Sequence, residues 1–154
     1  SADPAYVSLS LFIVAFLIIC FFFFFNDTAT TQIYTLSLHE LFRSTPIWNQ
    51  ISDRYNYEME RAYLNAHTHG IEPHIHRDDG DMTFIYYPRM DWRIDWGGGT
   101  AIYDNELNNI THHINYKGNR LIKFPANLPH QAQPVSRECY QLRTCVVFKT
   151  TRKK

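Results

Sequence analysis

The chain has 154 residues, and its 15 Lys and Arg balance its 15 Asp and Glu, so the formal net charge is zero. This length predicts one domain. The balanced charge argues against a nucleic-acid-binding protein, because such proteins usually carry a basic excess. A mean hydropathy of −0.34 excludes a protein built mainly from membrane spans. We therefore expect no nucleic-acid partner.

The first 44 residues differ from the rest, with eight of the 11 phenylalanines and only four charged residues. Residues 6–25 carry no charge and are numerous enough to cross a membrane as a helix. A signal peptide fits less well, because no basic residue precedes the run and no small-residue cleavage site follows it. Residues 21–44 also resemble the translation of a DNA-sequencing adapter behind a homopolymer tract. We interpret residues 1–44 as an apolar leader, either a sequence artefact, which we favour, or a membrane anchor. A membrane partner is expected only if residues 6–25 are genuine.

Residues 45–154 are expected to form the domain, with mainly β structure. Thr45 and Pro46 predict the start of a short helix over Pro46–Tyr55. Six segments rich in aromatic and β-branched residues follow, separated by turns that contain Gly, Asn or Pro. These predicted strands are Met59–Ala66, Met82–Tyr87, Thr100–Tyr103, Ile110–Tyr116, Arg120–Phe124 and Leu142–Phe148. Short strands at this spacing indicate an all-β sandwich, barrel or jelly roll.

Two of the three cysteines, Cys139 and Cys145, lie in this domain. On a strand their six-residue separation is too long for a disulfide bond. Free thiols are typical of a reducing compartment, so we expect a cytoplasmic protein. The alternative is a protein with a single membrane anchor at residues 6–25.

A His-x-Asp triplet, His76-Arg77-Asp78, is the first candidate metal-binding motif. Side chains two residues apart on a strand point to the same face, so this imidazole and carboxylate can reach one metal ion. His130 is the natural third ligand. His112 and His113 compete with it, but neighbouring residues on a strand face opposite sides, so only one of these two could contribute. Two histidines and one carboxylate form the ligand set of non-haem Fe(II) oxygenases.

The motifs around this triplet occur in a characteristic order. After His76 come TFIYYP, DW, GGGTAIY, GNRLIKFP, His130, and an arginine followed by TCVVFK. This order resembles the Fe(II)- and 2-oxoglutarate-dependent dioxygenases, in particular the prolyl 4-hydroxylase-like branch, over about residues 58–150. The resemblance implies a double-stranded β-helix (jelly roll). It also implies that His76, Asp78 and His130 bind iron, and that Arg143 and Tyr87 bind the distal carboxylate of 2-oxoglutarate.

The chemistry of these side chains suits the implied roles. A planar guanidinium binds a carboxylate through two parallel hydrogen bonds and keeps its charge at neutral pH, as Arg143 would need to do. Arg137 is the fallback anchor, because it lies within the longer than usual interval between His130 and Arg143. Tyr87 is either a carboxylate ligand or a core tyrosine.

The remaining conspicuous aromatic and histidine residues have no assigned role. Trp92 and Trp96 either line the site entrance or pack in the core. His67, His69 and His74 are expected at the rim or in solvent.

The activity that the resemblance implies is hydroxylation of a C–H bond with release of succinate and CO2. It would require Fe(II), 2-oxoglutarate as cosubstrate and O2, with ascorbate as a further candidate cofactor. The substrate would be a peptide, with peptidyl-proline favoured, or a small molecule. The alternatives are a non-catalytic metal-binding jelly-roll module and a truncated, membrane-anchored β domain.

Overall fold

The computed structural model describes residues 34–37, 42–43 and 45–154, and for residues 34–37 the backbone alone. The chain divides into two compact units, residues 1–32 and 33–154, and the described residues belong to the second. The predicted anchor at residues 6–25 lies outside the described residues. Within the described ranges, no helix is long and apolar enough to span a membrane.

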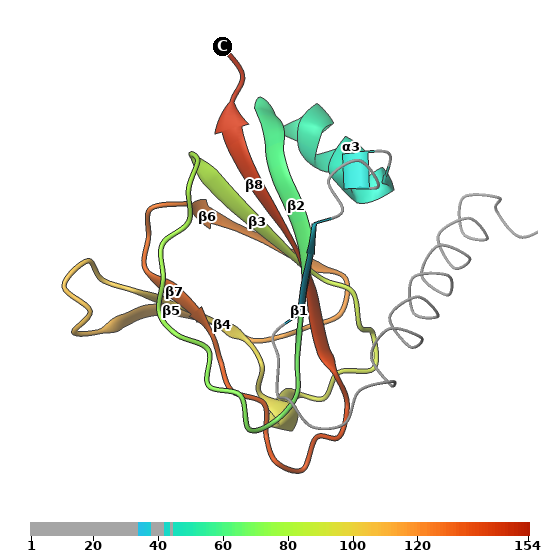
Figure 1. Ribbon diagram of the computed structural model, residues 1–154, viewed down its shortest axis with the longest axis vertical. Coiled ribbons are helices and arrows are strands. Elements are labelled where there is room, and N and C mark those ends of the chain that lie inside the picture. The colour runs from blue at the N-terminus through green and yellow to red at the C-terminus, as the bar shows by residue number, and fades with distance from the viewer. Residues whose placement is uncertain (1–33, 38–41, 44) are drawn as a thin grey trace, which may run out of the picture. The chain divides into compact units, whose positions relative to one another are not determined.

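Two antiparallel sheets build the described unit (Figure 1). The larger sheet has the order β1-β2-β8-β3-β6 and the smaller has the order β5-β4-β7. Strands far apart in sequence pair in both sheets, since β2 lies beside β8 and β4 lies beside β7. The bounds are β1 Tyr34–Ser37, β2 Tyr57–His67, β3 Met82–Tyr87, β4 Thr100–Tyr103, β5 Ile110–Ile114, β6 Arg120–Pro125, β7 His130–Ala132 and β8 Arg143–Arg152. This jelly roll confirms the predicted double-stranded β-helix.

The helix α3 (Pro46–Arg54) packs on the outer face of the larger sheet. Thr45 caps it, because the Thr45 hydroxyl accepts a hydrogen bond from the backbone N–H of Trp48 at 3.3 Å, and Pro46 occupies the first turn. The ring of Trp48 lies 5.8 Å from that of Phe148 on β8. Phe148 alternates with Val147, which faces the smaller sheet, so α3 covers the side of β8 away from the interior.

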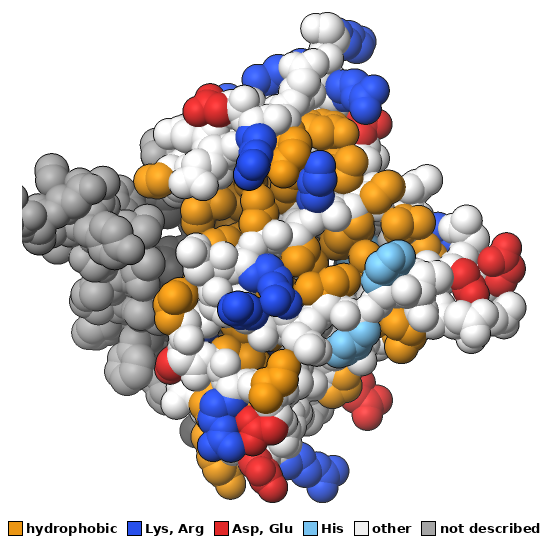
Figure 2. Space-filling model, turned by 180° about the vertical axis from the view of Figure 1, so that it is seen from behind, with side chains coloured by type: hydrophobic (Ala, Val, Ile, Leu, Met, Phe, Trp, Pro, Cys, Tyr) orange, Lys and Arg blue, Asp and Glu red, His pale blue; other side chains and the backbone are white. Residues whose placement is uncertain are grey.

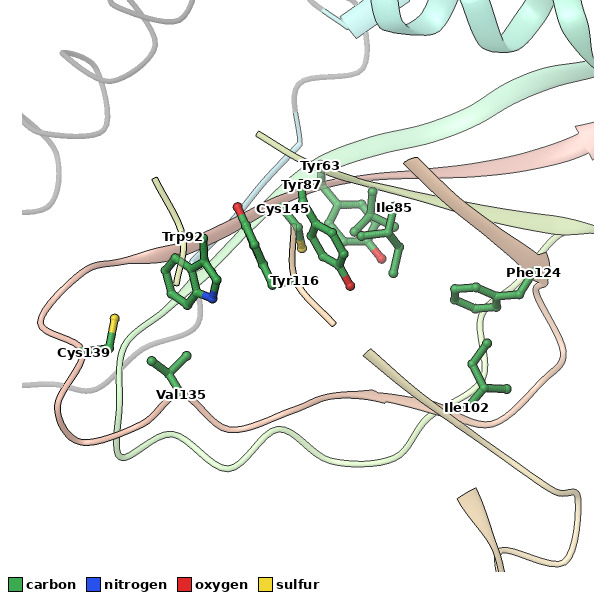
Figure 3. Packing of buried hydrophobic residues seen from close by; sticks show 11 residues of the cluster. Tyr63, Ile85, Tyr87, Trp92, Ile102, Tyr116, Phe124, Val135, Cys139 and Cys145 are labelled. Carbon is green, nitrogen blue, oxygen red and sulfur yellow. The ribbon is translucent and has the colours of Figure 1, made fainter. Parts of the chain in front are cut away.

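The core fills the space between the two sheets (Figure 3). Because side chains alternate along a strand, β8 directs four residues inward: Arg143, Cys145, Val147 and Lys149. Its neighbours β2 and β3 contribute Tyr63, Ile85 and Tyr87 to the same cluster, and β4 contributes Ile102 from the opposite sheet. The interior therefore has an apolar middle, with a cationic side chain near each end of β8.

Most predicted elements have their expected places. The strands Met82–Tyr87 and Thr100–Tyr103 match β3 and β4 at both ends, and α3 is one residue shorter than predicted. The sequence prediction missed β7, because this three-residue strand between Pro129 and Pro134 is too short to show an alternating pattern. It also missed β1, which pairs with β2 although it lies inside the predicted leader. The boundary between leader and domain stays a prediction.

The surface of the described residues carries scattered charges of both signs. On the face shown in Figure 2, Lys and Arg side chains are interspersed with hydrophobic and other side chains. The large hydrophobic side chains with the highest exposure among the described residues are Met90, Ile94 and Tyr140. Ile94 begins the short 3-10 helix η1 (Ile94–Trp96), and the other two lie in connecting segments.

Candidate metal centre and cosubstrate site

Three side chains of the predicted metal site converge in the structure. One ligand atom from each of His76, Asp78 and His130 lies within 4.8 Å of the other two. The Asp78 oxygens lie 3.8 Å from His76 Nε2 and 3.5 Å from His130 Nε2. Reciprocal backbone hydrogen bonds of 2.9 and 3.0 Å join His76 to His130 at the start of β7. The backbone pairing thus brings together residues that are 54 positions apart.

Both imidazoles are oriented by the peptide backbone. His76 Nδ1 lies 3.1 Å from the carbonyl oxygen of His74, and His130 Nδ1 lies 2.9 Å from that of Leu128. Because a carbonyl only accepts, we assign each Nδ1 as the N–H donor, which leaves Nε2 with its lone pair toward Asp78. A backbone partner of this kind commonly fixes the tautomer of a metal-binding histidine.

The convergence of these acceptor atoms gives a test of whether a metal fits. In this tautomer, two imidazole lone pairs face a carboxylate with no hydrogen between them, so a cation placed between the three groups would be attracted by all of them. His76 is 41% exposed at its side chain, whereas Asp78 and His130 are buried, which leaves one side of the cluster open to solvent. The residues present therefore fit a divalent cation with open coordination positions.

Asp78 has two further partners that the sequence prediction missed. Thr83 on β3 donates a hydrogen bond from Oγ1 to Asp78 Oδ2 at 2.7 Å, and Lys149 Nζ lies 2.9 Å from Oδ1. Burial acts to raise the pKa of Asp78, but His130 when it is protonated, the Lys149 ammonium and the Thr83 hydroxyl all stabilise the carboxylate, outweigh burial and hold this pKa well below its usual range. The same alternation that points Tyr87 inward from β3 also points Thr83 inward, and this was the available signal.

Arg143 lies fully inside the jelly roll at the first residue of β8. Its guanidinium donates to the carbonyl oxygens of Gly98 and Gly99 and lies 3.4 Å from Cys145 Sγ. The guanidinium carbon is also 5.7 Å from the centre of the Tyr87 ring. Among the described residues, no carboxylate forms an ion pair with Arg143. A buried cation without an acidic partner is expensive, so the arrangement suits an anionic ligand.

Tyr87 is the inward residue at the end of β3, with its ring beside Arg143. Its hydroxyl hydrogen-bonds to Thr100 Oγ1 at 2.6 Å, and burial raises its pKa. The ring stacks on Tyr116 at 4.4 Å, and burial raises the pKa of Tyr116 to about 12. Arg143, Tyr87 and Thr100 thus form one polar cluster inside an aromatic wall.

The glycine run shapes this polar cluster. Gly98 has φ +72°, and a Cβ there would lie 3.1 Å from the Trp92 ring and 3.2 Å from Arg143 Cδ. Only glycine adopts this positive φ without strain and leaves room for the Trp92 ring and the Arg143 side chain. Trp92 itself is buried and packs 4.7 Å from the Tyr116 ring, so Trp92 belongs to the core. Of the two interpretations for this tryptophan, core packing holds.

The other candidate residues lie elsewhere. Arg137, the fallback anchor, is exposed, as are His112 and His113 on β5 and His74 before the metal cluster. His69 is partly buried, with its Nδ1 3.2 Å from the carbonyl oxygen of Cys139.

His67 was predicted at the rim, and this was wrong. It is only 3% exposed, because β2 extends to this residue and pairs it with Arg143 on the inward face. Its Nε2 has no hydrogen-bond partner among the described residues. Burial, assisted by the charge of Arg143, lowers the pKa of His67 to about 4.

The comparisons with known proteins identify the family of the chain. The family model of the 2OG-Fe(II) oxygenase superfamily matches residues 53–149, so the chain belongs to this superfamily. Its cofactors are Fe(II), 2-oxoglutarate and O2. Among curated proteins, none matches this sequence significantly.

Solved structures with the same fold include prolyl hydroxylases. A prolyl 4-hydroxylase from Phytophthora capsici is similar with a TM-score of 0.59 and 17% identity, over 80% of this chain and 49% of that one. A Trichoplax adhaerens prolyl hydroxylase, in complex with a hypoxia-inducible-factor peptide fragment, has a TM-score of 0.55 and 20% identity, over 82% of this chain and 67% of that one. A 2OG-Fe(II) oxygenase family protein from Burkholderia pseudomallei has a TM-score of 0.53 and 16% identity, over 70% of this chain and 57% of that one. The chain spans about half the length of the Phytophthora enzyme, and these likenesses show the fold.

Proposed function

We propose that the protein is an Fe(II)- and 2-oxoglutarate-dependent oxygenase that hydroxylates a C–H bond of its substrate and releases succinate and CO2. The observation that carries the proposal is the convergence of His76, Asp78 and His130 in the same interior that holds Arg143, a buried cation with no carboxylate partner among the described residues. Superfamily membership supports it independently. When bound, iron would supply the redox chemistry that couples 2-oxoglutarate oxidation to substrate hydroxylation.

In this proposal, His76, Asp78 and His130 hold the metal and leave its other positions free. Arg143 binds the distal carboxylate of 2-oxoglutarate through its guanidinium, and the Tyr87 hydroxyl donates a hydrogen bond to the same carboxylate. Hydrogen bonds already hold the Arg143 guanidinium on Gly98 and the Tyr87 hydroxyl on Thr100. Binding of the cosubstrate would therefore cost little further side-chain entropy.

The apolar cluster between the sheets excludes bulk water from the cosubstrate. Tyr87, Tyr116 and Trp92 form its aromatic wall, and Ile85 and Val147 fill the middle of the interior. Low local polarity strengthens the attraction between Arg143 and a carboxylate, because the effective dielectric constant falls. The chain would thus position one end of the cosubstrate and leave its keto-acid end toward the histidines.

We propose a peptide side chain, with proline favoured, as the substrate, and a small molecule as the alternative. The solved complex of the Trichoplax enzyme with a peptide fragment supports a peptide. The exposed apolar side chains Met90, Ile94 and Tyr140 offer surface contacts for a chain of that kind. We also propose a cytoplasmic location, supported by the free thiols of Cys139 and Cys145.

The test is succinate formation from 2-oxoglutarate by the full chain with Fe(II) and O2, first alone and then with a panel of peptides and small molecules. We expect slow succinate release without substrate and faster release with the correct one. Asp78→Ala should abolish it and Arg143→Met should raise the KM for 2-oxoglutarate at least about tenfold. No succinate from folded, metal-binding protein would overturn the proposal.

A further inference from the structure

The Lys149 ammonium forms an ion pair with Asp78, the carboxylate of the candidate metal centre. Its Nζ lies 2.9 Å from Asp78 Oδ1, and the two side chains are 10% and 1% exposed. Lys149 reaches this position because it faces inward from β8, two residues after Val147, and the ammonium also lies 5.9 Å from the Tyr63 ring centre. A lysine at an inward strand position is rare unless its charge is paired.

The two oxygens of Asp78 have different partners. Oδ1 forms an ion pair with Lys149, while Oδ2 accepts a hydrogen bond from Thr83 and faces His130. The carboxylate is thus held on both sides before any metal arrives. A divalent cation bound by Asp78 would lie near the ammonium, and like charges repel strongly where water is largely excluded.

We propose that Lys149 is a positioning residue of the metal centre: it orients Asp78, balances its charge in the metal-free protein and limits the affinity for divalent cations. This inference rests on the proposed function, because it takes His76, Asp78 and His130 as metal ligands. A buried carboxylate left without any cation would destabilise the fold, so Lys149 supplies the positive charge that the metal-free protein needs. The metal then binds against a resident positive charge and stays exchangeable.

The experiment measures Mn(II) binding to the full chain without 2-oxoglutarate, by calorimetry and by the loss of the free Mn(II) EPR signal. Lys149→Met and Lys149→Gln remove the charge, whereas Lys149→Arg keeps it. We expect both neutral variants to bind Mn(II) at least about tenfold more tightly than the original protein. Lys149→Arg should stay within about threefold, because the charge remains. Lys117→Met, which removes an exposed lysine from the turn between β5 and β6, should change nothing.

A second readout is the melting temperature. Metal-free Lys149→Met should melt at a lower temperature than the original protein. Mn(II) should raise the melting temperature of Lys149→Met by more than it raises that of the original protein. If Lys149→Met does not fold, the Mn(II) affinity of Lys149→Gln decides. Unchanged or weaker Mn(II) binding by the neutral variants would overturn the role of Lys149. If the original protein binds no Mn(II), the proposed metal centre itself fails, which is a separate outcome.

Discussion

Replacing Thr83 by Val tests the hydrogen bond that fixes the metal-binding carboxylate. Thr83 is completely buried, and its hydroxyl donates to Asp78 Oδ2 at 2.7 Å. Hydrogen bonds to a charged group contribute about 1.5–3 kcal/mol to stability. Val keeps the branched shape and opens no cavity, so we expect the free energy of unfolding at pH 7 to fall by about 2 kcal/mol.

The pH dependence of this loss has a defined sign. The pKa of Asp78 is lowered in the folded protein, so the stability that it contributes is present above the unfolded value of about 3.9 and is lost as pH falls through the folded value. Thr83→Val raises the folded pKa and removes part of that contribution. Because the unfolded pKa is the same in both proteins, the difference between their stabilities should stay constant until pH falls to the folded pKa of the variant, and should narrow only below it.

Urea unfolding of metal-free protein, followed by circular dichroism from pH 7 to pH 2.5, measures both effects. Thr150→Val is the matched control, because Thr150 is also fully buried but donates to a neutral carbonyl, that of Met82, at 2.8 Å. Its loss should be about 1 kcal/mol at every pH. A Thr83→Val change below about 0.5 kcal/mol at pH 7, or one that grows as pH falls, would refute the reasoning.

Three further substitutions probe the interior beside the metal cluster. Gly98→Ala should destabilise the fold by about 1–3 kcal/mol in urea unfolding, because the residue has positive φ, and should raise the KM for 2-oxoglutarate by displacing Arg143. Tyr87→Phe should raise the same KM several-fold with little loss of kcat, since the ring remains; an unchanged KM would contradict its binding role. His67→Gln should flatten the loss of stability between pH 6.5 and about 4, because the folded protein resists protonation of His67 there and the unfolded chain does not. The exposed His113→Gln is the control and should leave the pH profile unchanged.

Much of the fold followed from local patterns in the sequence. The run Met82–Tyr87 is long and apolar enough to predict β3 at both ends, and the turn glycines separate the other strands. The pairing of the strands could not be predicted in this way, because β2 pairs with β8, which lies at the other end of the domain in sequence. Such pairings are set by tertiary packing, so β1 and the short β7 had no local signal of their own.

The site was predictable where chemistry and spacing coincide. The spacing of His76 and Asp78 predicts a shared face, and the resemblance supported His130 over His112 and His113 as the third ligand. Lys149 and His67 were missed for a physical reason: each is a polar residue near one end of a long strand, where burial depends on how far the strand continues. The strands β2 and β8 run further than predicted, and that extension turns both side chains inward.

The most direct test of the account is anomalous diffraction from crystals grown with Mn(II) and 2-oxoglutarate under anaerobic conditions. We expect one strong peak at bonding distance from Nε2 of His76 and His130 and from an oxygen of Asp78. We also expect the distal carboxylate of 2-oxoglutarate to bind Arg143. A metal held by other residues, or a cosubstrate bound away from Arg143, would contradict it.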